Sequence, residues 1–147
     1  MPHHKQKYHS KHSVDEIFSL VLDIERYPEF LPWCDAATIN SQEEGEMLAV
    51  LVISFKGFAE SYTSRVRSMK GRGHARVEAE AVDGPFDHLK NLWVMEADPG
   101  GGTSITFEID FAFRSKVLQA LLTFWFDSAC MKMVKAFEER ADKLYGQ

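Results

Sequence analysis

The chain has 147 residues, of which 45% are hydrophobic and 27% are charged. This size and composition are typical of one globular domain, which buries its core without needing metal or disulfides, so we expect a single domain over residues 1–147. The net charge of −5 disfavours a dedicated DNA-binding protein, because phosphate contacts require a basic face. The two cysteines, Cys34 and Cys130, have no metal-ligand spacing and indicate no disulfide framework.

The N-terminal residues Met1–Lys5 lack the apolar core of a signal peptide and the composition of a transit sequence. No apolar run approaches the ~18 residues of a membrane-spanning helix. We therefore expect a soluble protein of the cytoplasm.

The first elements are predicted to be a strand over residues 3–11 and a helix that begins at Ser13. Ser13–Glu16 has the pattern of a capping box, in which serine and glutamate satisfy each other's free backbone amides. The helix is expected to end near Glu25, and its apolar residues share one face: Val14, Ile17, Phe18, Val21 and Leu22.

Residues 27–34, which we call the aromatic loop, have the sequence YPEFLPWC. Pro28 and Pro32 disfavour a helical conformation at the residue before each of them. The prediction is a rigid loop with large apolar side chains. Because loops are normally polar and lie at the surface, this one is expected to cap the core or to border an apolar pocket.

Six strands with short connections are expected to follow, which favours antiparallel neighbours. Their ranges are 35–43, 46–55, 58–69, 74–82, 86–97 and 103–113. The strand at 46–55 is apolar on both faces, so we expect both faces to be covered. In the strand at 103–113, Phe107 and Phe111 are expected to face inward and Glu108 and Asp110 outward.

A long helix is predicted from Ser115 to about Tyr145. One face carries a continuous apolar stripe, and the first three turns are also apolar on the opposite side, with no charge between residues 117 and 126. A surface helix is not normally apolar all round, so this end is expected to meet a ligand, a partner, a lipid surface or the aromatic loop. The predicted fold is α+β: a curved antiparallel sheet wrapped around a long C-terminal helix, with a short helical segment after strand 1.

The interior of this fold permits two interpretations. If Val77 faces inward, Ala75, Ala79 and Ala81 do so too, and this strip of small side chains leaves either a cavity or a gap that larger residues fill. Asn91 is on the same face as Trp93 and needs a hydrogen-bond partner, which the polar head group of a ligand could supply.

The sequence contains no nucleophile elbow, phosphate loop, zinc-protease motif or C-x-x-C pair. The spacing of His3, His4, His9 and His12 fits no tight metal site, and a solvated terminal strand is the preferred interpretation. Cys34 has apolar neighbours, which disfavours a reactive thiolate. The basic hairpin, residues 65–76, carries Arg65, Arg67, Lys70, Arg72 and Arg76, and either forms a solvated hairpin or contacts anionic lipid or RNA.

In four places along the chain the sequence resembles the coenzyme Q-binding family of START-like, helix-grip proteins, within the polyketide cyclase/dehydrase superfamily. This family also includes bacterial ribosome-association toxins. The matching segments are the aromatic loop, Gly57-Phe58 with Tyr62–Val66, Gly84-Pro85-Phe86 with Leu89 and Trp93, and Phe111–Ser115 with Ala136–Arg140.

The resemblance implies a hydrophobic tunnel that holds ubiquinone (coenzyme Q), and a lipid chaperone that supports respiratory electron transfer without being an enzyme. No catalytic cofactor is expected, and ubiquinone is the bound ligand. A bacterial cytoplasm with transient contact at the inner membrane fits this role. The expected ligand-binding residues are Phe30, Trp33, Tyr62, Asn91, Trp93, Phe107, Phe111, Leu118, Leu121, Leu122 and Trp125.

Two other functions remain open. A protein that binds the large ribosomal subunit and blocks subunit association would use the basic hairpin, and a local patch of charge can override the net acidity. A polyketide cyclase or dehydratase would be consistent only by analogy of fold, and would need a buried acid–base pair that the sequence does not supply.

Overall fold

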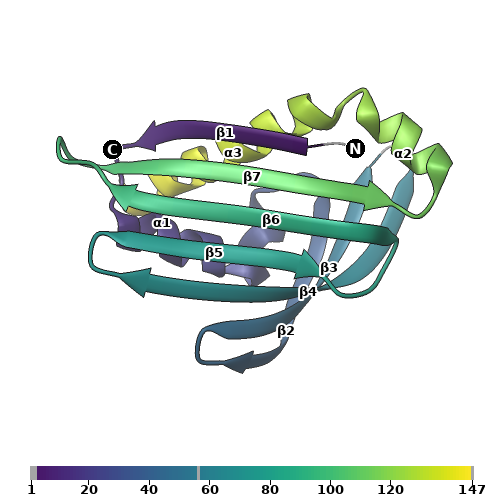
Figure 1. Ribbon diagram of the computed structural model, residues 1–147, viewed down its shortest axis with the longest axis horizontal. Helices are drawn as coiled ribbons and strands as arrows, with labels where there is room; N and C mark the ends of the chain where they lie inside the picture. Colours follow the sequence, from purple (N-terminus) through teal and green to yellow (C-terminus); the bar gives the residue numbers. More distant parts are fainter. Residues whose placement is uncertain (1–2, 56, 147) are drawn as a thin grey trace.

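The computed structural model describes residues 3–55 and 57–146, without the side chains of Phe55, Phe58 and Leu122. Seven antiparallel strands form one sheet in the order β1-β7-β6-β5-β4-β3-β2 (Figure 1). The strands are β1 (His3–Ser10), β2 (Cys34–Glu43), β3 (Glu46–Phe55), β4 (Phe58–Gly71), β5 (His74–Ala81), β6 (Phe86–Ala97) and β7 (Thr103–Phe113). All six strands expected after the aromatic loop are therefore present, each within two residues of its predicted ends.

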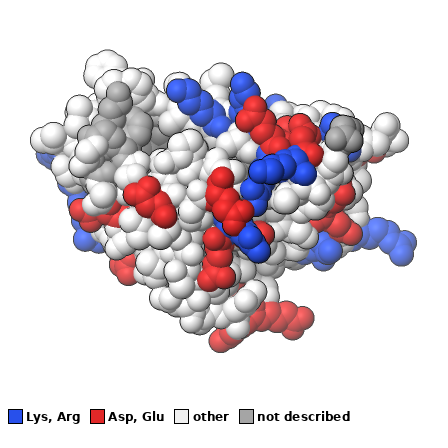
Figure 2. All heavy atoms as spheres, turned by 180° about the vertical axis from the view of Figure 1, so that it is seen from behind, with Lys and Arg blue, Asp and Glu red and all other residues white. Residues whose placement is uncertain are grey.

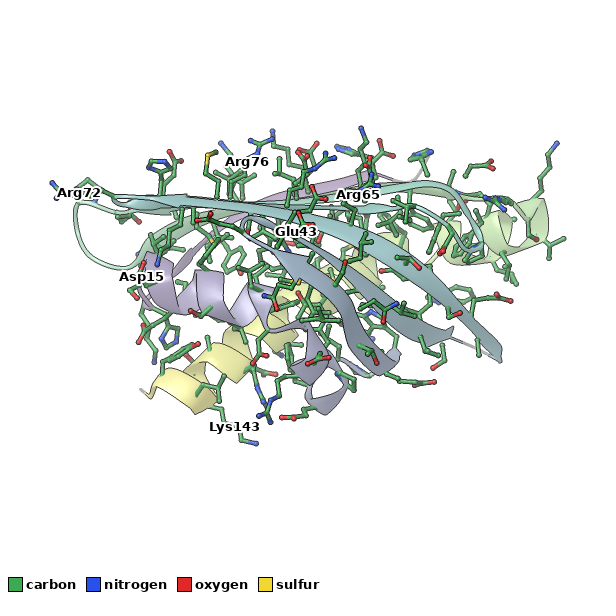
Figure 3. The ribbon with its side chains drawn as sticks, turned by 90° about the horizontal axis from the view of Figure 1, so that it is seen from below. Asp15, Glu43, Arg65, Arg72, Arg76 and Lys143 are labelled. Carbon is green, nitrogen blue, oxygen red and sulfur yellow. The ribbon has the colours of Figure 1, made fainter. Side chains whose placement is uncertain are left out.

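The helices α1 (Val14–Leu22) and α3 (Phe126–Tyr145) lie together against one face of the sheet (Figures 1 and 3). The face that they cover carries the largest fully buried side chains, among them Phe107, Met95 and Ile105. The inward alternation predicted for β7 is confirmed at Ile105, Phe107 and Phe111. In β3 only one face is fully buried, at Met47, Ala49 and Leu51, and the other is half-buried. The prediction that both faces of this strand are covered is therefore only partly confirmed.

The capping box of α1 is present as predicted. The Ser13 hydroxyl accepts from the Glu16 amide at 3.1 Å, and the Glu16 carboxylate accepts from the Ser13 amide at 3.0 Å. Each bond satisfies a backbone donor that the first helical turn would otherwise leave unpaired.

Replacing Ser13 by alanine is expected to lower the free energy of unfolding by about 1 kcal/mol, because it removes the acceptor at the start of α1. Urea denaturation followed by circular dichroism measures this loss. Ser19→Ala, at an exposed position within the same helix, is the matched control and is expected to be neutral or slightly stabilising. Equal effects of the two substitutions would show that capping does not stabilise α1.

The aromatic loop begins inside a short helical segment rather than after it. A 3-10 helix, η1 (Ile24–Glu29), continues the chain beyond α1 and contains Pro28. The prediction that helix ends near Glu25 was therefore wrong. Pro28 is the fifth of the six residues of η1, and a segment this short has few backbone hydrogen bonds for a proline to remove. Beyond it, the Leu31 amide donates to the Tyr27 carbonyl at 2.8 Å, which folds the loop back on itself.

The long C-terminal helix is interrupted, contrary to the prediction of one helix from Ser115 to Tyr145. Helix α2 (Lys116–Thr123) ends before Phe124, and α3 begins at Phe126. The Thr123 hydroxyl donates to the Gln119 carbonyl at 2.7 Å, and such back-bonding by threonine often bends a helix. Consequently α2 leaves the line of α3 and lies at the end of the sheet beside β7 (Figure 1).

Candidate ligand-binding surfaces

Three of the expected ligand-binding residues, Trp93, Phe107 and Phe111, are buried in the core among other aromatic rings. Trp93 packs edge-on against Phe107 and Phe137, with ring centroids 4.8 and 4.9 Å apart. Phe111 packs against Phe126 at 4.8 Å. Between the sheet and α3, therefore, large rings occupy the space left by the small side chains of β5. An apolar ligand could enter this layer only if some of these rings moved.

An open pocket of about 550 Å³ lies at the aromatic loop, where the lining includes Pro28–Pro32, Cys34 and Asp35. Phe30 borders it and packs on Tyr27 and Phe137, at 5.9 and 5.1 Å between centroids. The loop thus caps the core, as expected, whereas the pocket that it borders is not purely apolar, because Glu29 and Asp35 also line it. Trp33 is half-buried and packs against the core.

Two other expected ligand contacts already have protein partners. Asn91 is half-buried, and its amide nitrogen donates to the Glu108 carbonyl at 2.9 Å, so the sheet supplies the partner that a ligand head group was expected to provide. Tyr62 packs on Phe86 at 5.1 Å, and burial raises the pKa of its hydroxyl far above the ordinary value.

Helix α2 and the two residues that follow it present large apolar side chains to solvent. The exposed fractions are 72% for Val117, 51% for Leu121, 86% for Phe124 and 40% for Trp125, and we call these four residues the α2 surface. Leu118, on the other side of the helix, packs against the core, and the side chain of Leu122 is outside the described residues. Exposure of this much contiguous apolar area usually marks a binding surface.

The expected ligand-binding residues of the aromatic loop and those of the α2 surface do not form one entrance to a tunnel. Phe30 contacts Phe137 and Arg140 on α3, and Phe137 lies about 16 Å along the helix axis from Phe126, at 1.5 Å per residue. The α2 surface is beyond the Phe126 end (Figure 1). The structure therefore provides two separate candidate surfaces: the apolar α2 surface at one end of the buried aromatic layer, and the pocket at the aromatic loop, which also has acidic residues in its lining, at the other.

Most basic side chains of the basic hairpin lie close to acidic side chains. Arg65 lies 3.7 Å from Glu80, Arg67 3.2 Å from Glu46, Lys70 3.2 Å from Asp15 and Arg76 3.2 Å from Glu78. Arg65 and Arg76 project from the face of the sheet opposite the helices, and Arg72 is at the hairpin tip (Figure 3). This pairing weakens the positive potential that contact with phosphate would need. On the helix side, acidic and basic side chains are intermixed (Figure 2).

The structure gives the candidate catalytic groups ordinary roles. Glu108 and Asp110 are on the outer face as predicted, where His3 and His88 lie within 2.7 and 3.2 Å of them. Burial raises the pKa of Cys34 to about 11 and that of Cys130 to about 12. Both thiols are therefore protonated at neutral pH and are poor nucleophiles.

Arg140 links α3 to the start of the aromatic loop. Its Nη2 donates to Glu29 Oε1 at 2.6 Å, and Arg26 Nη1 donates to Glu29 Oε2 at 3.0 Å. These hydrogen bonds, first from Arg140 and then from Arg26, hold the pKa of Glu29 below its ordinary value.

Because the pKa of Glu29 is lower in the folded protein, its contribution to stability is present above the unfolded-state pKa of about 4.3 and is lost as pH falls through the folded value. We expect Glu29→Gln to lower the urea midpoint at pH 7, and the difference from the unmodified protein to shrink below about pH 4. Glu43→Gln, at an exposed position in β2, is the control. A difference that stays constant with pH would contradict this account.

The sequence patterns did not predict one cluster of side chains, formed by His12, Glu138 and Asp142. His12 is only 4% exposed, and its Nε2 lies 2.7 Å from Asp142 Oδ1. The expectation of a solvated strand is therefore wrong for His12, which follows β1 and turns inward. Glu138, one turn before Asp142 on α3, completes a group whose three ligand atoms lie within 4.8 Å of one another. Spacing could not reveal it, since His12 and Asp142 are 130 positions apart.

The family model described as "Polyketide cyclase / dehydrase and lipid transport" matches residues 10–138. The chain belongs to this family. Its seven-stranded curved sheet and C-terminal helix match the STAR-related lipid transfer protein of Xanthomonas axonopodis, with a TM-score of 0.80 at 15% identity over 95% of this chain and 85% of that one. The predicted helix-grip fold is thus confirmed.

Individual members of the family are more similar in sequence. The ribosome association toxin RatA of Rickettsia prowazekii is 40% identical over 130 residues, which are 88% of each chain. A mitochondrial coenzyme Q-binding protein of Xenopus laevis is 29% identical over 92% of this chain, which spans 56% of that protein's length. An 18 kDa protein of Caulobacter crescentus, known in solution, is 31% identical over the whole of both chains, with a TM-score of 0.77.

Proposed function

We propose that this protein binds a polyprenyl quinone such as ubiquinone and acts as a lipid chaperone, not as an enzyme. The observation that carries the proposal is the α2 surface, where four large apolar side chains face solvent, in a chain whose family is described as including lipid-transport proteins as well as polyketide cyclases and dehydrases. The sequence similarity to a coenzyme Q-binding protein supports the choice of a quinone.

In this proposal the α2 surface lies on a bilayer from which the quinone is taken. Among the described residues, no helix is both long and apolar enough to cross a membrane, so contact would be at the surface. Phe124 and Trp125 would insert among the lipids, as aromatic side chains of interfacial helices do. The exposed Arg114 and Lys116 would contact anionic head groups, and no acidic residue lies between Asp110 and Asp127 to oppose this.

The prenyl tail would occupy the aromatic layer around Trp93, Phe107 and Phe111, with displacement of some rings. Each isoprene unit provides roughly 4 kcal/mol of gross burial energy at ~0.8 kcal/mol per CH₂. Two or three units would offset the ~4–15 kcal/mol cost of immobilising the ligand, although repacking the rings adds to that cost. Affinity would therefore come mainly from the tail.

Titration of the purified protein with ubiquinone, followed by tryptophan fluorescence, tests the proposal. We expect saturable quenching by a quinone with two or more isoprene units and none by the tailless ring at the same concentration. Trp93 is in the proposed layer, so Trp93→Phe should remove much of the signal, whereas Trp125→Phe should not. Equal binding of tailed and tailless quinones, or no binding of either, would reject the proposal.

Association with the ribosome is the second candidate, favoured by the 40% identity to a protein named as a ribosome association toxin. The exposed Arg72 at the hairpin tip is the best contact for RNA phosphate, because the other four basic residues of the hairpin have acidic neighbours. Co-sedimentation with ribosomal subunits at moderate salt tests this function, with an Arg65/Arg67/Arg72 triple alanine variant as comparison. Failure of the unmodified protein to sediment with either subunit would exclude it.

A further inference from the structure

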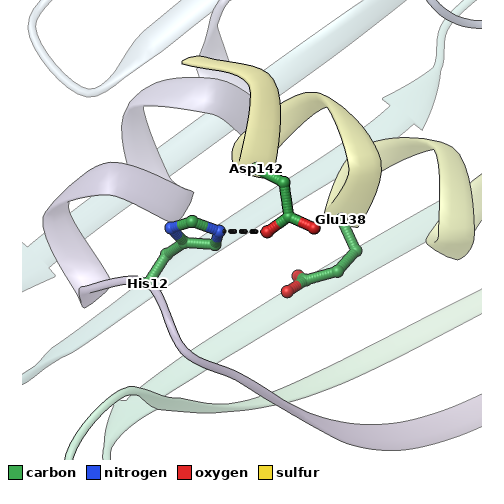
Figure 4. Close-up of side chains that lie close together, drawn as sticks. All are labelled: His12, Glu138 and Asp142. Carbon is green, nitrogen blue, oxygen red and sulfur yellow. Dashed lines mark hydrogen bonds and ion pairs between the residues drawn. The ribbon is translucent and has the colours of Figure 1, made fainter. Parts of the chain in front are cut away.

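The cluster of His12, Glu138 and Asp142 lies where the end of β1 meets the last turns of α3 (Figure 4). His12 is fixed from several sides: its amide donates to Ser10 Oγ at 3.2 Å, its carbonyl accepts from Thr103 Oγ1 at 2.7 Å, and its ring packs against Tyr145. The imidazole is therefore held in place, with Nε2 directed at α3.

The two carboxylates come from successive turns of α3 and lie on the same side of the helix (Figure 4). Glu138 Oε2 accepts from the Ser10 hydroxyl at 3.0 Å. Its other oxygen, Oε1, is buried and has no hydrogen-bond partner among the described residues. A buried carboxylate oxygen without a donor costs free energy, so this position is suited to a positive ligand.

The negative charge of the carboxylates around His12 is also not fully balanced by positive groups. Asp142 is 46% exposed and lies 3.6 Å from Lys11 Nζ, a pair that solvent screens. The Glu16 carboxylate lies 3.8 Å from His12 Nδ1, which adds a third acidic group on the far side of the ring. Three carboxylates thus surround one imidazole and one lysine, and a divalent cation would balance them better than the single His12–Asp142 bond does.

We infer that His12, Glu138 and Asp142 form a site for a divalent transition metal, with Zn²⁺ as the best match. An imidazole with two carboxylates is a ligand set that Zn²⁺ binds, whereas Mg²⁺ and Ca²⁺ prefer oxygen ligands alone. Zinc–ligand distances of about 2.0–2.2 Å place neighbouring ligands about 3.4 Å apart. The three ligand atoms lie within 4.8 Å of one another, so modest side-chain rotations would bring them to bonding distance.

Water would complete the coordination on the side of Asp142 that faces solvent. Glu16, behind His12 Nδ1, is in the position of the outer carboxylate that orients a metal-bound histidine. The bound ion would link the segment after β1 to the last turns of α3. The hydrogen bonds of the sheet do not provide this link, because α3 is not part of the sheet. This site is distinct from the α2 surface and from the aromatic loop.

The test is a Zn²⁺ titration of the metal-free full chain by calorimetry, with Co²⁺ absorption as a second measurement. We expect one ion per chain with micromolar or tighter affinity, weakened at least tenfold in Glu138→Gln and in Asp142→Asn. Both substitutions keep the shape of the side chain, and the amide group introduced by Glu138→Gln retains an oxygen for the Ser10 hydroxyl. Zinc should also raise the melting temperature of the unmodified protein and not that of the variants.

The matched control is His9→Gln, because His9, near the end of β1, also lies beside an acid, 3.3 Å from Asp98, yet is 55% exposed. It should bind zinc as the unmodified protein does. Absence of stoichiometric binding, undiminished affinity in both α3 variants, or loss of binding in His9→Gln would each overturn the inference. If a variant fails to fold by circular dichroism, the Co²⁺ spectrum of the unmodified protein decides, since Co²⁺ in a four-coordinate site of three side chains and one water absorbs far more strongly than hydrated six-coordinate Co²⁺.

Discussion

Phe107→Ala is expected to lower the free energy of unfolding by about 3–5 kcal/mol, which is the usual cost of removing a buried phenylalanine. Phe107 has no exposed surface and packs against Trp93 in the aromatic layer between sheet and α3. Its neighbouring rings, Trp93 and His4, come from two different strands, β6 and β1, so they cannot close the resulting cavity without moving the backbone. Urea denaturation monitored by fluorescence and circular dichroism measures the loss.

Phe124→Ala provides the comparison, because it removes the same atoms from a side chain that is 86% exposed. It should change stability by less than about 0.5 kcal/mol. If the cavity of Phe107→Ala lies where the prenyl tail binds, this variant should also regain stability when quinone is added. Similar losses in the two variants would show that the aromatic layer is not the principal core.

Phe124→Asp is expected to weaken binding to anionic vesicles about tenfold or more while leaving the fold intact. Inserting a phenylalanine into the apolar region of a bilayer contributes about 1.5–3 kcal/mol, and an aspartate adds repulsion from anionic head groups. The neighbouring Trp125 and Leu121 would retain part of the affinity. Flotation of the protein with vesicles of phosphatidylglycerol and phosphatidylethanolamine measures the change.

Met131→Asp is the matched control for the α2 surface. Met131 is 57% exposed on α3, so the substitution places the same charge on an exposed apolar position outside α2. It should float with vesicles as the unmodified protein does. An equal loss in both variants would indicate a general effect of charge, and binding unaffected by Phe124→Asp would show that the α2 surface does not contact lipid.

Most of the fold could be predicted because local chemistry determines it. The capping box at Ser13 fixes the start of α1, glycine and proline turns separate the strands, and alternation in 103–113 specifies which face of β7 is inside. The two errors arose where weak local signals decide the outcome. Pro28 suggested a break and instead lies within η1. The C-terminal helix is interrupted after Thr123, whose hydroxyl donates to the Gln119 carbonyl, without any proline or glycine nearby.

The candidate ligand-binding surfaces could be predicted only in part. The absence of charge over residues 117–126 indicated the exposed surface of α2, but not its separation from Phe30, which depends on how far along α3 each segment packs. The alanines of β5 suggested a cavity, while ring packing around Trp93 depends on contacts among β6, β7 and α3. The cluster at His12 joins the two ends of the chain, a contact that only the fold brings about.

Extraction of the freshly purified protein with organic solvent, followed by mass spectrometry, most directly tests whether a prenylated quinone is the natural ligand. Expression in a bacterium that makes ubiquinone allows the protein to load in the cell. The account predicts a quinone at a fixed ratio to protein, reduced in Phe124→Asp and unchanged in Met131→Asp. Extracts with no quinone above that of an unrelated protein, together with no uptake from quinone-loaded vesicles, would contradict it.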